Sequence, residues 1–300
     1  MLYSINEDDK KYINKWVPKS DAFNITNIKI NNIDIKYIEA IAVVESPGIP
    51  INSWIVDGKP LPKEIRVNKN ISTILFLERL GSTYCIMIGS KQSEGRIRSH
   101  LMKTSNKRNG PEWGRVEFKE VPGYIFDKHF YYWLIKSKKN LINTVDNRSF
   151  VLNDVKGFKS DSERQSNSYE GEGSNIDSEV PLKSLVSLDE KLVSLYIDIL
   201  IDHNKTYNFF LDYDGRISIY PGSCGKFVSS TPEMFEINQT VLNIYFDILP
   251  MLLSEFNKAK QNGWNELENS FKKELSIDVI VKLIQENNIN IREIQQAIMN

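Results

Sequence analysis

The chain has 300 residues, of which 41% are hydrophobic and 26% charged, and its formal net charge is -1. This length and composition are typical of a soluble chain with one large or two smaller domains. The balanced charge excludes a globally basic nucleic-acid binder but not a local basic patch. The first residues include Glu7, Asp8 and Asp9 without an apolar run, which resembles no secretory signal and favours a cytoplasmic protein.

Strand and helix signals alternate in the first half of the chain. A capping box at Ser4 and Glu7 predicts a short helix, and turn residues separate the apolar runs that follow. In chain order we expect a helix ending at Pro18, a hairpin over residues 25–35, a buried strand over 38–44, a connector over 47–62 with a turn at Asp57-Gly58, a hairpin over 71–89, a helix over 94–103, a strand over 114–121 and an aromatic helix from Asp127.

The second half begins with a change of composition. Residues 156–181 are rich in Ser, Gly and acidic side chains, which predicts a flexible loop or linker between domains at 1–155 and 182–300. Beyond it we expect a three-strand meander over residues 192–201, 207–211 and 217–220, a long buried helix over 231–260 kinked at Pro250, and two short helices opened by Ser276 and Asn290.

The fold class expected from this order is α+β. The N-terminal part should be a mostly antiparallel sheet with two helices, and the C-terminal part a three-strand meander packed on a long helix, followed by short terminal helices. Asn243 and Asp247 interrupt the apolar run of the long helix, so it is not expected to span a membrane.

Residues 91–119 form a locally basic stretch. They hold eight positive and three negative side chains, which leaves five net positive charges. On the expected helix Arg96, His100 and Lys103 share one face, which could follow a phosphate backbone, and Trp113 could stack on an unpaired base. The alternative is a solvated helix face followed by a loop. The candidate nucleic-acid-binding residues are Arg96, Arg98, His100, Lys103, Lys107, Arg108, Trp113 and Arg115.

A second chemistry is suggested by Glu117-Phe118-Lys119 on the expected strand. This pattern resembles the Glu-x-Lys strand of metal-dependent nucleases of the PD-(D/E)xK type. The resemblance implies that Glu117 would share a metal with an acid on the preceding strand. Glu78 is the nearby acid on a strand, and no aspartate occurs between Asp57 and Asp127. A surface pair of charges is the favoured interpretation.

Other candidate motifs favour structural roles. The run Asp212-Tyr213-Asp214-Gly215 lacks the ligands that would follow in a calcium loop and predicts a hairpin turn. The histidines, His100, His129 and His203, lie on separate elements without zinc spacing, and Cys85 and Cys224 form no metal or disulfide pattern. We therefore expect no metal or cofactor.

The aromatic helix allows two interpretations. Phe130, Trp133 and Leu134 share a face, as in core packing. Tyr131, Tyr132 and Ile135 lie on other faces and would mark a protein interface if they were exposed.

The function expected from these patterns is binding rather than catalysis. We expect an accessory protein of an intracellular complex that contacts DNA or RNA through the basic stretch, with a protein partner or a second copy and without a membrane. The alternatives are a metal-dependent nuclease, and a purely protein-binding regulator of the kind found in host–phage conflict.

Overall fold

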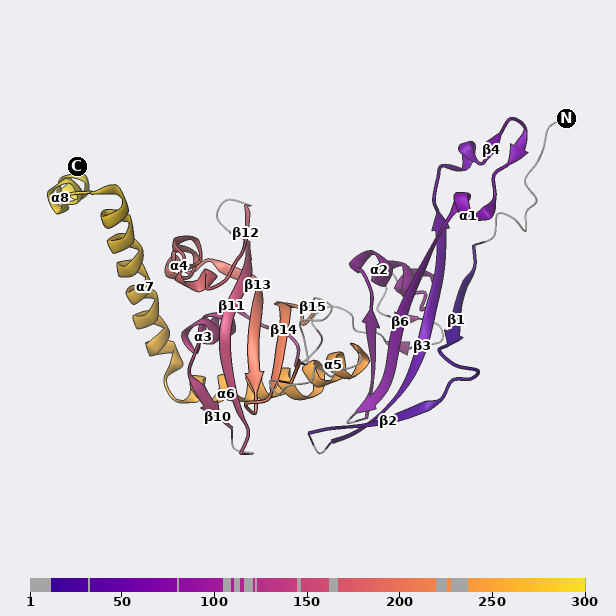
Figure 1. Ribbon diagram of the computed structural model, residues 1–300, viewed down its shortest axis with the longest axis horizontal. Helices are drawn as coiled ribbons and strands as arrows, with labels where there is room; N and C mark the ends of the chain where they lie inside the picture. The colour runs from indigo at the N-terminus through magenta and orange to yellow at the C-terminus, as the bar shows by residue number, and fades with distance from the viewer. Residues whose placement is uncertain are drawn as a thin grey trace. The chain divides into compact units, whose positions relative to one another are not determined.

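The computed structural model (Figure 1) describes residues 12–31, 33–79, 81–104, 109–110, 114–115, 121, 123–144, 147–161, 167–219, 226–227 and 237–299. The protein is α+β, with helices and antiparallel sheets, as the sequence predicted. It forms two compact units, Met1–Phe118 and Lys119–Asn300. Among the described residues, no helix combines the length and the apolar character needed to cross a membrane.

The first unit is built on an antiparallel sheet. Its strands are β1 (Asn14–Pro18), β2 (Ile25–Ile30), β3 (Ile33–Pro47), β6 (Val67–Arg79) and β7 (Ser82–Ile88), in the order β1-β3-β6-β7 with β2 beside β3. Both predicted hairpins are confirmed, since β2 pairs with β3 and β6 with β7. Asn31 and Gly81 take positive φ angles of 44° and 73° in the turns, a conformation that asparagine and glycine tolerate best.

The first strand corrects one prediction. A helix ending at Pro18 was expected, but residues 14–18 form β1 and pair with β3, while residues 1–11 lie outside the described part of the chain. Trp16 lies opposite Ala42 and contacts Phe76 edge-on, with 5.4 Å between ring centroids. Packing against the sheet outweighs the local helix signal because it partly buries this large side chain.

A small tip and one helix complete the first unit. The tip contains η2 (Ile51–Ser53), the hairpin β4 (Ile55–Val56) and β5 (Lys59–Pro60), and α1 (Lys63–Arg66). Asp57 and Gly58 have φ angles of 49° and 73°, which is the pattern of a type I′ turn and confirms the predicted tight turn. Helix α2 (Lys91–His100) follows β7, and the short strands β8 (Asn109–Gly110) and β9 (Gly114–Arg115) follow α2.

The second unit contains the other large antiparallel sheet. The predicted meander is present as β13 (Lys191–Ile201), β14 (Lys205–Asp212) and β15 (Ile217–Ile219). The remaining strands are β10 (Leu141–Asn143) and β11 (Ser149–Asp161) in line with the meander, with β12 (Ser168–Glu172) beside β11 and β16 (Lys226–Phe227) beside β14.

The segment expected to be a linker is part of this sheet. Residues 156–161 belong to β11, which pairs with β13 over most of its length, and residues 168–172 form β12 on its other side. After β12 come η3 (Ile176–Ser178) and α4 (Val180–Ser187). Ladder hydrogen bonds therefore join this polar segment to the meander within one unit. The boundary between the two units lies between Phe118 and Lys119 instead.

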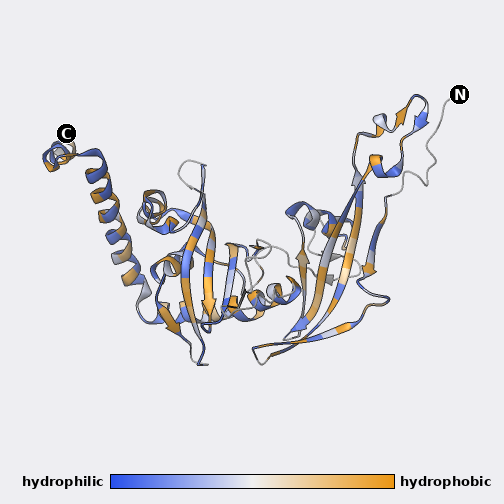
Figure 2. Cartoon of the chain, viewed as in Figure 1, coloured by the Kyte–Doolittle hydropathy of each residue, from blue (hydrophilic) through white to orange (hydrophobic). Residues whose placement is uncertain are grey.

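The core of the second unit lies between one face of the sheet and several helices. Helix α3 (Lys128–Lys136) is the predicted aromatic helix, and the Asp127 side chain accepts a hydrogen bond from Phe130 N at its start. Apolar bands, orange in Figure 2, run along β11, β13 and β14. Four alternating residues of β13 point into this core and are at most 2% exposed: Leu195, Ile197, Ile199 and Ile201.

The long buried helix is present, and it contains a π-helical turn just before Pro250, where a kink was expected. It is described from residue 237 onward, as α5 (Ile237–Asn243), the π-helical turn η4 (Ile244–Ile248) and α6 (Leu249–Gln261). Pro250 lies in the first turn of α6, immediately after the π turn. A proline has no N–H to donate and clashes with the carbonyl four residues earlier, so a wider turn before it is the expected accommodation.

The end of the chain differs from the prediction in one helix. Residues 264–287 form a single helix, α7 (Trp264–Asn287), so Ser276 opens no helix; its Oγ donates to Lys272 O within α7 at 2.9 Å. Helix α8 (Ile291–Met299) begins as predicted. Asn290 Oδ1 accepts from Arg292 N at 3.0 Å, and Glu293 Oε2 accepts from Asn290 N at 2.9 Å.

Candidate functional site

Half of the eight candidate nucleic-acid-binding side chains are described. Arg96, Arg98 and His100 lie on α2, and Lys103 lies just beyond its end. Lys107, Arg108 and Trp113 lie outside the described residues, and Arg115 is described only as a backbone position of β9. The candidate site can therefore be tested on α2 alone.

Helix α2 is held on the sheet by one apolar side. Ser90 caps it by accepting from Ser93 N at 3.1 Å. Ile97 is buried against the sheet, where it packs with Ala42, Val44 and Ile74. Because this side is fixed to the sheet, the residues on the far side of the helix face solvent.

The outward face of α2 carries positive charge. His100 and Lys103 are exposed, and Arg96 is half-buried. The Arg96 side chain makes no hydrogen bond or ion pair to the residues that the structure describes, although its carbonyl accepts from Ser99 Oγ at 3.1 Å. The helix expected to reach Lys103 ends at His100; Lys103, three residues later, has a φ of 54°, and the amide of Thr104 donates to Arg98 O at 2.8 Å. That closing bond fixes where the Lys103 backbone leaves the helix.

Arg98 is not part of the open face. Its Nε donates to Oε1 of Glu94, one helical turn earlier, and its side chain is 15% exposed. Four cations and one anion lie between residues 91 and 103, so three positive charges are left over, on Lys91, Arg96 and Lys103. These three charges and His100 are what α2 can offer to an anionic ligand.

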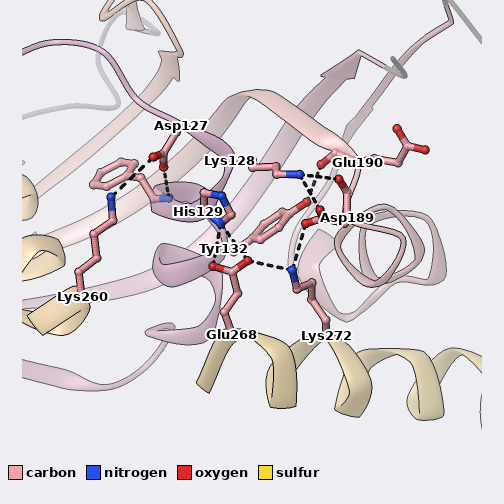
Figure 3. A network of polar contacts seen from close by, with 10 residues as sticks. Asp127, Lys128, His129, Tyr132, Asp189, Glu190, Lys260, Glu268 and Lys272 are labelled. Atoms are coloured by element: carbon pink, nitrogen blue, oxygen red, sulfur yellow. Dashed lines mark hydrogen bonds and ion pairs between the residues drawn. The ribbon is translucent and has the colours of Figure 1, made fainter. Parts of the chain in front are cut away.

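The second unit contains another cluster of polar side chains (Figure 3). We name this cluster the α3–α7 network. Oε1 and Oε2 of Glu268 both lie 2.9 Å from Nδ1 of His129, and Lys272 Nζ lies 3.0 Å from Oε1 of the same carboxylate. Lys272 also donates to Asp189 at 3.1 Å, and Lys128 donates to the other oxygen of Asp189 at 2.6 Å.

The α3–α7 network fastens helices to one another. Burial alone would raise the pKa of Asp189, but hydrogen bonds from Lys128 and Lys272 outweigh it and hold that pKa below its usual value. Burial lowers the pKa of Lys272, and Glu268 and Asp189 more than restore it, so the net direction is upward. Each charge is thus matched by a neighbour on another element, which is typical of a structural network.

The aromatic helix is a core element. Tyr131, Tyr132 and Ile135 are buried, like Phe130, Trp133 and Leu134, so they mark no exposed interface. Tyr131 Oη donates to Leu211 O at 3.0 Å and Tyr132 Oη to Glu190 O at 2.5 Å, which satisfies both hydroxyls inside the protein.

No metal centre is found in the part of the chain that the structure describes. It contains no group of three His, Cys, Asp or Glu side chains close enough to hold an ion. Glu117 and Lys119 lie outside the described residues, and Glu78 is an exposed position of β6 opposite Thr83. The Asp212–Gly215 run forms the predicted hairpin turn, and Asp214 there accepts from Arg216 Nε at 2.8 Å.

Comparison with models of known protein families gives no match, and a search of characterised proteins gives none either.

Proposed function

We propose that this protein is a non-catalytic binding protein whose first unit contacts nucleic acid through α2. One observation carries the proposal. Arg96 and His100 lie one turn apart on α2 and Lys103 follows its end, and Arg96 has no ion-pair partner among the described residues. Positive side chains free of internal partners can neutralise phosphates and release their counterions.

The test measures binding of short fluorescent oligonucleotides by fluorescence anisotropy at low salt. The four probes are single-stranded DNA, double-stranded DNA, single-stranded RNA and double-stranded RNA. We expect the triple variant Arg96→Ala, His100→Ala, Lys103→Ala to bind at least about tenfold more weakly than the wild type. Lys36→Ala is the matched control, because Lys36 is an exposed residue of β3 in the same unit.

The proposal fails if the triple variant binds as tightly as the wild type, or if the wild type binds none of the four probes. Arg98→Ala adds a further check. Because Glu94 already neutralises Arg98, this variant should lose less affinity than Arg96→Ala.

A second candidate function is self-association through the end of the chain. Helix α8 exposes Ile291 and Ile298, at 65% and 79%, and the last turns of α7 expose Ile277, Ile280 and Val281. The partner proposed for this face is a second copy of the chain. Helix α8 has one positive and one negative side chain, Arg292 and Glu293, so no net charge opposes pairing of two copies.

Light scattering during size exclusion tests this second candidate. We expect the mass of the wild type to rise toward that of a dimer with concentration, and the variant Ile291→Ser, Ile298→Ser to remain a monomer. A wild-type mass that stays monomeric at every concentration would exclude the candidate.

A further inference from the structure

In the described part of the first unit, five buried polar atoms have no hydrogen-bond partner. They are Tyr12 Oη, Ser46 Oγ, Asn70 Nδ2, and the Nε and Nη1 atoms of Arg66. Buried polar atoms are nearly always hydrogen-bonded, because leaving one unpaired costs free energy. Five such atoms in one region of the fold therefore call for a common explanation.

The sheet register brings three of these side chains to one face. Ser46 lies opposite Asn68 on β6, and Asn70 is two positions further along that strand, so both project from the same face as Ser46. Tyr12 lies one step beyond the β1–β3 ladder, where Glu45 N donates to Ile13 O at 3.1 Å, and this places it opposite Ser46.

The Trp54 ring lies beside both Arg66 and Tyr12, which places Arg66 close to the three side chains on this face. The Arg66 guanidinium carbon lies 4.9 Å from the centre of the Trp54 ring, and the Trp54 and Tyr12 ring centroids are 6.5 Å apart. Gly48 N donates to Arg66 O at 2.8 Å, so Arg66 sits just beyond the end of the β3–β6 ladder, near Ser46. Arg66 is 4% exposed and Trp54 is 1% exposed.

The neighbouring carboxylate does not neutralise Arg66. Glu45 alternates with Ser46 along β3 and so projects from the opposite face of the sheet. There it accepts from Ile13 N at 2.8 Å and forms an ion pair with Lys63 at 2.9 Å. Among the described residues, no carboxylate forms an ion pair with the buried Arg66 guanidinium, and the Trp54 ring lies against it. A buried cation is costly unless an anion joins it.

The chemistry of the five atoms identifies the missing partner. The arginine and asparagine nitrogens can only donate, and the two hydroxyls can donate as well as accept. A metal ion needs acceptors, so it does not fit this set, whereas an oxyanion accepts several hydrogen bonds and pairs with a guanidinium through two of its oxygens. We propose that Tyr12, Ser46, Arg66 and Asn70 bind the oxyanion group of a ligand, a phosphate or a carboxylate, next to the Trp54 ring.

The five atoms are shielded from solvent, so access requires a local movement. The tip, residues 48–66, joins the sheet at Gly48 and Arg66, and its Trp54 ring lies beside both Arg66 and Tyr12. Displacement of the tip would expose the donors, and binding of the anion would supply their missing hydrogen bonds. This site involves none of the α2 residues proposed to bind nucleic acid, and the two proposals stand or fall separately.

Thermal unfolding of the full chain tests the site. The probes are sodium phosphate and sodium acetate, with sodium chloride at equal ionic strength as the reference. We expect phosphate, acetate or both to raise Tm in a saturable manner, since a ligand bound only by the folded state stabilises it. A response to one anion alone would identify the class of ligand group.

Three variants make the test specific. Arg66→Met keeps the apolar stem and removes the donors, so the rise in Tm should disappear, whereas Arg79→Met, at the far end of β6, should keep it. If Arg66→Met does not fold, Tyr12→Phe decides, because losing one donor should shift the half-saturating anion concentration upward several-fold. The proposal is overturned if neither anion raises the wild-type Tm above the chloride reference, or if Tyr12→Phe responds as the wild type does.

Discussion

At the residue scale, the best-defined polar group of the second unit is the Glu268 carboxylate. Its side chain is only 4% exposed, and it is shared by His129 and Lys272. Three elements meet there, since His129 belongs to α3, Lys272 to α7, and Lys272 reaches Asp189 after α4. Such a carboxylate stabilises the fold only while its charged partners remain in place.

We predict that Glu268→Gln lowers the free energy of unfolding by about 1–3 kcal/mol, because it removes the anion from beside a partly buried lysine. Urea denaturation measures the change. Glu274→Gln is the matched control: its carboxylate is 62% exposed and pairs with Lys136 at 2.7 Å, so its loss should cost less than about 1 kcal/mol. Equal decreases in the free energy of unfolding of the two variants would show that the buried Glu268 carboxylate stabilises the fold no more than an exposed one does.

Asp189 gives the network an acid dependence. Its folded pKa lies below the usual value of 3.8, so the unfolded chain takes up the proton first as pH falls. Its stabilising contribution is therefore present above pH 3.8 and is lost as pH drops through the lower, folded pKa. In acid denaturation, Asp189→Asn should show a shallower loss of stability than the wild type below pH 4; identical slopes would contradict this. Asparagine suits the site because Asp189 has a φ of 62°.

At the element scale, the sequence predicted structure best where turn chemistry and alternation agree. The Asn31, Asp57 and Gly81 turns have positive φ, and the strands expected on both sides of the Asn31 and Gly81 turns are present. The Asp57 turn was expected within a connector, and it joins the short strands β4 and β5. The errors occurred where tertiary contacts override a local signal. Trp16 packing turned an expected helix into β1, and the mid-helix Ser276 satisfied its hydroxyl within α7 instead of capping a new helix.

The polar segment 156–181 shows a further limit of local reasoning. Its composition indicated a linker, yet Lys156 pairs with Asp198 at 2.5 Å and Lys159 with Glu170 at 3.6 Å across neighbouring strands. Charged side chains on the open face of a sheet can therefore imitate a linker, because composition does not reveal strand pairing.

Burial of α6 against the sheet supports a prediction at the same scale. Leu249 is fully buried, so Leu249→Ala should lower the free energy of unfolding by about 2–5 kcal/mol. Leu267→Ala, at a 59% exposed position of α7, should change it by less than about 0.5 kcal/mol. Chemical denaturation compares the pair, and similar effects of the two substitutions would mean that α6 does not pack as described.

At the scale of the whole molecule, the chain combines two units with different balances of charge. In the second unit, the α3–α7 network matches its charges internally, whereas α2 in the first unit leaves Arg96 and Lys103 without such partners among the described residues. Helical spacing predicted that Arg96 and His100 lie one turn apart on α2, but the helix ends at His100, so this spacing does not fix the position of Lys103. The sequence could not predict that Glu94 holds Arg98, nor that the Arg66 guanidinium lies over the Trp54 ring, since both depend on side-chain geometry.

The salt dependence of nucleic-acid binding tests the central proposal most directly. For the wild type, the logarithm of the binding constant should fall linearly with the logarithm of salt concentration, and Arg96→Ala should reduce the slope by about 0.7 for single strands or about 0.9 for duplex DNA, the value of one phosphate contact. Lys36→Ala should leave the slope unchanged. If wild type and Arg96→Ala give the same slope, α2 does not contact the phosphate backbone.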